Sequence, residues 1–302
     1  MRAHFIAFFT VVLAVNILLS RPLWAYGVVT TIAPLQFIAQ QVMKGVAEPT
    51  QIITGYHSPH HFQLKPSQRH AIAKADLVLY VSPSLESFLP AGHDDEKYIA
   101  LIHTRGLILR SLPTSLGHKS LNHHPHSGVK AADPHIWLAP YNMKIMAQEI
   151  SRILMEKDPA HAALYRQNSQ SLIQQITKIE QNAADILDNM KKVAFVVEHP
   201  AYGYFEEQFD LHHIGHVKPT EDIPPSAKHI KDLQNMLRQT PVNCLIYDKS
   251  RPSRTSQALA ARYNLKLISV DPLGRQLPLD GNYYTHLINR HVQAFSTCEQ
   301  SL

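Results

Sequence analysis

The chain has 302 residues, which fits one large or two medium-sized domains with a full hydrophobic core. Hydrophobic residues make up 45% and charged residues 18% of the sequence, a composition that excludes wholesale disorder. The net charge of +5 is mild and no concentrated Lys/Arg face is apparent, so we expect no nucleic-acid partner.

Residues 1–25 (MRAHFIAFFTVVLAVNILLSRPLWA) have the pattern of a secretory signal peptide. Positive charge precedes an apolar run from Phe5 to Leu19, and the small residue Ala25 precedes the expected cleavage point. A transmembrane anchor is the alternative, but the run is short and is interrupted by Asn16. We therefore expect an exported protein whose mature chain begins near residue 26.

Short apolar runs separated by helical patterns follow along the chain. The runs are typical of buried parallel strands and fall at 27–32, 50–54, 76–81, 193–197, 244–248 and 266–271. Helical patterns fall at 33–44, 68–75 and 226–239. This alternation predicts an α/β fold with parallel sheets.

The segment 113–134 (PTSLGHKSLNHHPHSGVKAADP) is rich in Pro, Gly, Ser, Asn and His and has few apolar residues, so we expect a mobile surface loop. It contains four candidate auxiliary metal ligands: His118, His123, His124 and His126. The loop is interpreted either as a weak metal trap near the main site or as a polar linker whose histidines do nothing specific.

The segment 158–190 contains no Gly, and Pro159 at its start is its only Pro. Apolar residues spaced four and three apart predict one long helix with a single buried stripe, formed by Leu172, Ile176, Ile179, Ala183, Ile186 and Met190. We expect two similar α/β lobes, 26–157 and 192–302, joined by a rigid linking helix over 158–191. The alternative is a long crossover helix within one domain.

Two cysteines, Cys244 and Cys298, lie in the part of the chain that would be exported. An even pair in an exported protein favours a disulfide, and two buried free thiols are the alternative.

The sequence has 20 His residues, nearly as many as its 24 Asp and Glu residues, which raises the expectation of metal handling. In open α/β sheets, ligands bind beyond the carboxyl ends of the strands. Four candidate ligands follow predicted strands or precede a short apolar run: His60, His135, His199 and Asp271. Three imidazoles and one carboxylate suit Zn²⁺. Each residue alone also fits a structural role in a loop or turn.

The stretch GYHSPHHFQLKPS (55–67) holds three histidines, His57, His60 and His61, in a run that is broken by Pro59 and closed by Pro66, and these prolines favour an irregular turn. Such a turn can point one imidazole into a cleft. His61 is a possible competitor of His60, and His57 is the weakest candidate.

Several blocks in the same order carry a family resemblance: SPHHFQLKPSQ, ADLVLYVSPSLESFL, DPHIWLAP, EHPAYGYFEEQF, LHHIGH and SVDPLG. Together they resemble the metal-specific class of ABC-transporter substrate-binding proteins, most closely its periplasmic high-affinity zinc-uptake members. The resemblance implies that His60, His135 and His199 bind the metal, with Asp271 or water as the fourth ligand. It also implies that the two cysteines pair. Pro59 and Pro200 stand where many members carry an acidic residue.

The resemblance further implies a periplasmic, monomeric carrier that is not an enzyme. It would hold Zn²⁺ in a cleft between two lobes and deliver it to an inner-membrane ABC permease with its ATPase. Alternatives are a manganese or iron carrier of the same fold and a secreted zinc hydrolase, for which Glu198 would be the candidate base. Because imidazole must be neutral to coordinate, we expect zinc affinity to fall as the pH drops through about 6.5.

Overall fold

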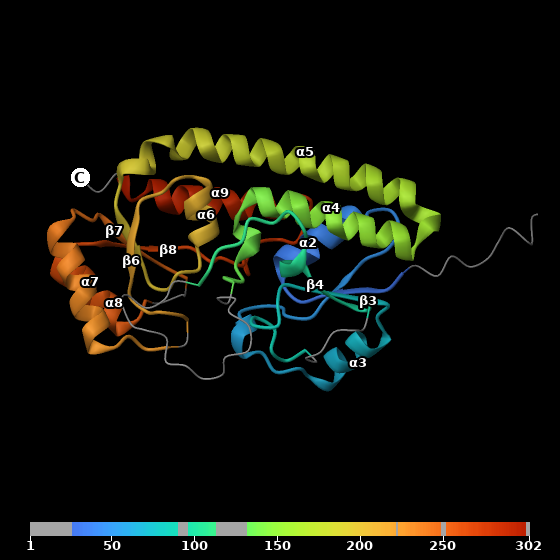
Figure 1. Ribbon diagram of the computed structural model, residues 1–302, viewed down its shortest axis with the longest axis horizontal. Helices are drawn as coiled ribbons and strands as arrows, with labels where there is room; N and C mark the ends of the chain where they lie inside the picture. The colour runs from blue at the N-terminus through green and yellow to red at the C-terminus, as the bar shows by residue number, and fades with distance from the viewer. Residues whose placement is uncertain (1–25, 90–95, 113–131, 222, 249–251, 300–302) are drawn as a thin grey trace, which may run out of the picture.

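The computed structural model describes residues 26–89, 96–112, 132–221, 223–248 and 252–299 (Figure 1). The predicted signal peptide and the histidines at 118, 123, 124 and 126 lie outside these residues. Within them, each helix is either too short or too polar to cross a membrane.

The N-terminal lobe contains a four-stranded parallel sheet in the order β2-β1-β3-β4. Its strands are β1 (Val28–Thr30), β2 (Thr50–Gln51), β3 (Leu77–Tyr80) and β4 (Tyr98–Ala100). Its helices are α2 (Ala33–Val42), α3 (Pro66–Lys74) and α4 (Pro140–Lys157). The central strands β1 and β3 are buried along their full lengths, which explains why their sequences are continuous apolar runs.

The C-terminal lobe repeats this topology with a parallel sheet in the order β6-β5-β7-β8. Its strands are β5 (Phe195–Val197), β6 (His213–His216), β7 (Cys244–Tyr247) and β8 (Lys266–Ser269). Its helices are α6 (Gly203–Gln208), α7 (Ala227–Gln239), α8 (Arg254–Tyr263) and α9 (Tyr283–Ser296). The two matching sheets confirm the predicted α/β fold with two similar lobes, and all six predicted strands are present.

Helix α5 (Ala162–Leu187) joins the lobes and, with short 3₁₀ turns at Pro159–His161 and Asp188–Lys192, makes the chain helical from 159 to 192. Figure 1 shows α5 running along one side of both lobes, with α4 and α9 packed beneath it. The predicted stripe is buried except for Ile186, which is 54% exposed. Leu187, four residues after Ala183, takes its place because the helix keeps the same face toward the core with that step.

Helix α9 belongs to the C-terminal lobe and packs against the N-terminal lobe. Phe37 of α2 packs on Tyr283 and Tyr284 of α9, with ring centroids 5.7 Å and 6.2 Å apart. The Tyr284 hydroxyl donates to the Trp137 carbonyl over 3.1 Å. Side chains of both lobes thus share one continuous core, which favours a fixed arrangement of the lobes over free hinge motion.

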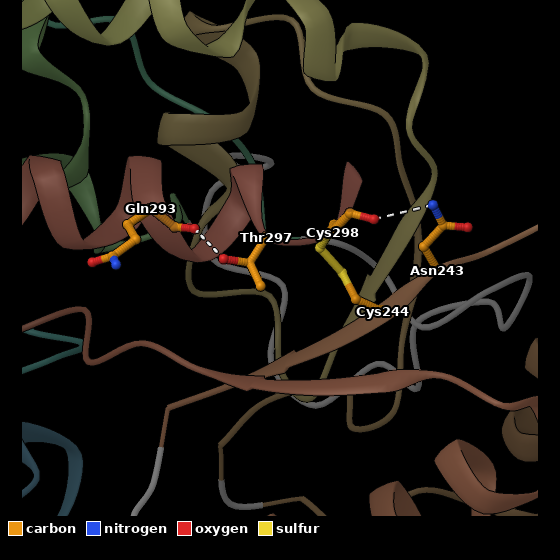
Figure 2. Close-up of a disulfide and its surroundings, with 5 residues drawn as sticks. All are labelled: Asn243, Cys244, Gln293, Thr297 and Cys298. Atoms are coloured by element: carbon orange, nitrogen blue, oxygen red, sulfur yellow. Dashed lines mark hydrogen bonds between the residues drawn. A yellow bond between two sulfur atoms is a disulfide. The ribbon is translucent and has the colours of Figure 1, made fainter. Parts of the chain in front are cut away.

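A disulfide links Cys244, on β7, to Cys298, just beyond α9, with Cα atoms 5.4 Å apart (Figure 2). The predicted pairing is therefore present. The Asn243 side chain donates to the Cys298 carbonyl over 3.0 Å, which fixes the same tail a second time. The end of α9 is thereby anchored to a central strand of the C-terminal sheet.

Candidate metal site

His60 lies in a three-residue 3₁₀ turn, Pro59–His61, that follows the carboxyl end of β2. Pro59 occupies the first position of the turn, and the backbone N–H of His60 donates to the Ser58 hydroxyl over 3.3 Å. These features place the predicted irregular turn where it was expected. The His60 side chain is 22% exposed, so this imidazole forms part of a surface opening.

His135 precedes a second 3₁₀ turn (Ile136–Leu138) and is buried. Asp133 Oδ1 accepts the His135 backbone N–H over 3.0 Å and lies 2.7 Å from the ring Nδ1. The backbone contact is that of an Asx turn, so His135 has a structural role in a turn together with a ring contact. With Nδ1 engaged, Nε2 is the ring nitrogen presented for a metal, an arrangement common among metal-binding histidines.

His199 follows β5 at its carboxyl end and is 4% exposed. Burial, followed by repulsion from His135, lowers the pKa of His199 to about 3. Its ring is therefore neutral at every pH from 5 to 8 and needs to lose no proton before it binds a metal. The pH dependence expected near 6.5 does not arise from this residue.

The three histidines line one small cavity, whose walls also include Trp137, Glu221, Asp248 and Arg275. The ring centroid of His135 lies 5.9 Å from that of His60 and 6.1 Å from that of His199. Two imidazoles on one tetrahedral Zn²⁺ have ring centres about 5 Å apart. As placed, no three His, Cys, Asp or Glu side chains of the described residues are close enough together to hold a metal ion. The imidazole rings must come closer to one another by about 1 Å before they can bind one Zn²⁺ together.

Asp271 does not line this cavity, although Pro272 and Leu273 beside it do. Its carboxylate accepts the backbone N–H groups of Leu273 and Arg275, over 3.0 Å and 2.7 Å, and pairs with the Arg275 guanidinium at 3.0 Å. It lines a different hollow, between β8 and α9. The structure therefore brings the three predicted imidazoles to one cavity but not the predicted carboxylate, whose role as a ligand stays a prediction.

The other predicted candidates are placed as follows. His61 is exposed on the same turn as His60. His57 packs edge-on against Phe62 and lines a neighbouring hollow beside Arg275. Neither of them lines the cavity formed by the described histidines.

Glu198, the candidate base of the hydrolase alternative, is buried and fully engaged. Its carboxylate pairs with Lys218 Nζ at 3.3 Å and accepts the Ser253 backbone N–H at 3.2–3.3 Å. It thus fixes the loops that follow β6 and β7. A general base needs a carboxylate that can reach a substrate, and this one is committed to structural contacts.

Three charged residues that line the cavity were not predicted: Glu221, Asp248 and Arg275. Asp248 Oδ1 lies 3.7 Å from His199 Nδ1. It directly follows β7, so the strand-end argument applied to His199 also applies to Asp248. Glu221 follows β6, whose sequence HIGH lacks an apolar run, and no periodicity signal pointed to it.

Comparison with known proteins shows the family to which the chain belongs. The family model described as zinc-uptake complex component A, periplasmic (ZnuA), matches residues 28–298. The chain therefore belongs to the ZnuA family of periplasmic zinc-uptake components. This family works in transport through an ABC system and is not a family of enzymes, so the hydrolase alternative is set aside.

Individual relatives cover nearly the whole chain. The high-affinity zinc uptake system protein ZnuA of Yersinia pestis is 28% identical over 304 residues, covering 95% of this chain and 96% of the relative. ZnuA of Brucella abortus is 27% identical, covering 90% and 91%. A crystal structure of ZnuA has the same fold, with a TM-score of 0.71 and 22% identity, and covers 90% of this chain and 99% of that one.

Proposed function

We propose that this protein captures one Zn²⁺ between its lobes, through His60, His135 and His199, and hands it to a membrane permease with its ATPase. The observation that carries the proposal is the convergence of imidazoles from both lobes on one cavity. Membership of a zinc-uptake family and relatives named as high-affinity zinc uptake proteins support zinc as the cargo.

The chemistry of the cavity suits this cargo. Three imidazole nitrogens favour Zn²⁺ over Mn²⁺, which prefers more oxygen donors. Asp133 holds the His135 ring through Nδ1, and His199 is neutral without losing a proton. The His135 ring is therefore oriented, and the His199 ring is neutral, before the metal arrives, which lowers the free-energy cost of arranging these ligands on binding.

The rest of the proposal concerns the setting. The protein would enter the periplasm through a signal peptide at 1–25, act as a monomer and dock on the permease with the metal bound. Lobe boundaries at 157–158 and 191–192 are proposed from the helical connection between the two sheets.

The test is competition titration of the untagged, metal-free protein with Zn²⁺ against Mn²⁺, followed by zinc-dependent stimulation of the reconstituted permease and ATPase. We expect tight 1:1 binding of Zn²⁺, at least tenfold tighter than Mn²⁺, and stimulation by the zinc-loaded protein. Preferential Mn²⁺ binding would instead make the protein a manganese carrier. A failure to bind either ion would contradict the carrier proposal.

A further inference from the structure

Glu221 of the C-terminal lobe reaches across the cavity to the turn that bears His60. Beyond β6, the backbone N–H of Val217 donates to the Val197 carbonyl over 2.9 Å. The backbone N–H of Lys218 donates to the Glu198 carbonyl over 2.8 Å. These bonds prolong the sheet and carry the chain toward the site. The Glu221 side chain is only 14% exposed there.

The contacts of the Glu221 carboxylate join it to the N-terminal lobe. The Ser58 hydroxyl donates to Glu221 Oε2 over 3.0 Å, and the same oxygen lies 3.9 Å from His60 Nε2. In a tetrahedral zinc site, nitrogen and oxygen donors on bonds of about 2.0–2.2 Å are about 3.4 Å apart. A movement of about half an ångström would let both atoms bind one ion.

The other carboxylates near the cavity are poorly placed for this role. Asp271 must first leave the Arg275 guanidinium and two backbone N–H groups. Asp248 faces Nδ1 of His199 and so lies on the side of the ring away from Nε2. Asp133 is buried behind His135, also against Nδ1. Glu221, by contrast, approaches the Nε2 atom of His60.

Charge favours the same assignment. Three neutral imidazoles leave the full dipositive charge of Zn²⁺ in a cavity whose walls are largely buried, with the Arg275 guanidinium close by. One coordinating carboxylate would halve that charge, and a carboxylate oxygen is an ordinary zinc ligand. Asp271 is already paired with the Arg275 guanidinium, which favours a carboxylate from another residue.

We propose that Glu221 supplies the fourth donor to the captured Zn²⁺, while Ser58 orients its carboxylate and Arg275 keeps Asp271 away from the metal. The inference rests on the proposed function. In this arrangement each lobe contributes two donors: His60 and His135 from the N-terminal lobe, and His199 and Glu221 from the C-terminal lobe.

The test compares the zinc affinity of Glu221→Gln with that of Asp271→Asn, measured by competition with a chelator, in the full mature chain. Both changes remove a charge and keep the shape of the side chain, so they are matched. We expect Glu221→Gln to weaken zinc binding at least tenfold and Asp271→Asn less than threefold. Thermal melting of the metal-free variants checks that both are folded.

A second readout is independent of affinity. Zinc X-ray absorption on the wild type should show three nitrogens and one oxygen at about 2.0–2.2 Å, and a crystal structure of the loaded protein should place Glu221 at that distance. Equal affinity of wild type and Glu221→Gln, or a fourth ligand from Asp271 or water, would overturn the inference while leaving the three-histidine site standing. Wild-type protein without tight zinc binding would contradict the proposed function instead.

Discussion

The buried pair His135 and His199 differs from the His60 turn in how firmly each imidazole is held. The pair is buried, and each ring has a carboxylate on its Nδ1 side, at 2.7 Å for His135 and 3.7 Å for His199. His60 is 22% exposed and sits on a three-residue turn. The difference suggests that the pair forms a fixed half of the site and that the turn completes it.

Removal of either buried imidazole should have the largest effect on zinc binding. We expect His135→Ala and His199→Ala each to weaken zinc affinity at least a hundredfold, equivalent to about 2.7 kcal/mol, because a ligand fixed in place is lost. His60→Ala should cost about tenfold to a hundredfold. Chelator competition measures all three, with His57→Ala as the control that changes affinity less than twofold. A larger loss from His60→Ala than from the pair would reverse the comparison.

Removal of the disulfide tests whether the fixed positions of His135 and His199 depend on the anchoring of α9. The double variant Cys244→Ser, Cys298→Ser removes the disulfide, whose two cysteines are 54 residues apart in sequence. We expect a loss of about 2–4 kcal/mol of unfolding free energy and a fall in Tm of about 5–15 °C. Zinc affinity at 25 °C should change less than threefold, since no ligand moves. Calorimetry and titration on the same sample separate the two quantities; an unchanged Tm would show that the bridge contributes nothing.

Asp133→Asn tests how much the fixed orientation of His135 contributes. The amide can still accept the His135 backbone N–H, but it holds the ring through Nδ1 more weakly than a carboxylate does. We expect a tenfold to hundredfold loss of zinc affinity with little change in Tm. The matched change Asp158→Asn, at a carboxylate that contacts His161 Nδ1 at 2.7 Å away from the site, should leave affinity unchanged. Equal effects of the two variants would show that Asp133 acts through general stability.

The smallest expected effect concerns pH and a buried histidine outside the site. Burial lowers the pKa of His291 on α9 to about 4, whereas an unfolded histidine titrates near 6.5. Below pH 6.5 the unfolded chain therefore binds the proton first, and stability falls as the pH drops toward 4. We expect this residue to cost about 1–2 kcal/mol between pH 7 and pH 5, and His291→Leu to flatten that slope. Urea unfolding at both pH values measures it; an unchanged slope would exclude His291 as the source.

The sequence predicts much of this arrangement because the relevant signals are local. The apolar runs define the strands, and the rule that ligands gather at strand ends points to His60 and His199. His135 precedes a short apolar run instead, and its assignment as a ligand comes from the family resemblance. Asp271 obeys the same rule, yet Arg275, four residues later, pairs with its carboxylate. Strand spacing carries no information about that side-chain pair.

Glu221 and α9 illustrate the other part that sequence patterns leave out. Glu221 follows β6, whose two histidines and glycine hide the strand, and its partner Ser58 is 163 residues away. The packing of α9 across both lobes rests on contacts such as that of Phe37 with Tyr283, which are even farther apart in sequence. Long-range contacts of this kind require the folded structure.

The most direct test of the account is a crystal structure of the zinc-loaded protein with the metal located by its anomalous signal. The account predicts one Zn²⁺ within about 2.0–2.1 Å of a ring nitrogen from each of His60, His135 and His199. A strong zinc peak elsewhere, with the His135 ring still about 6 Å from the rings of His60 and His199, would contradict it.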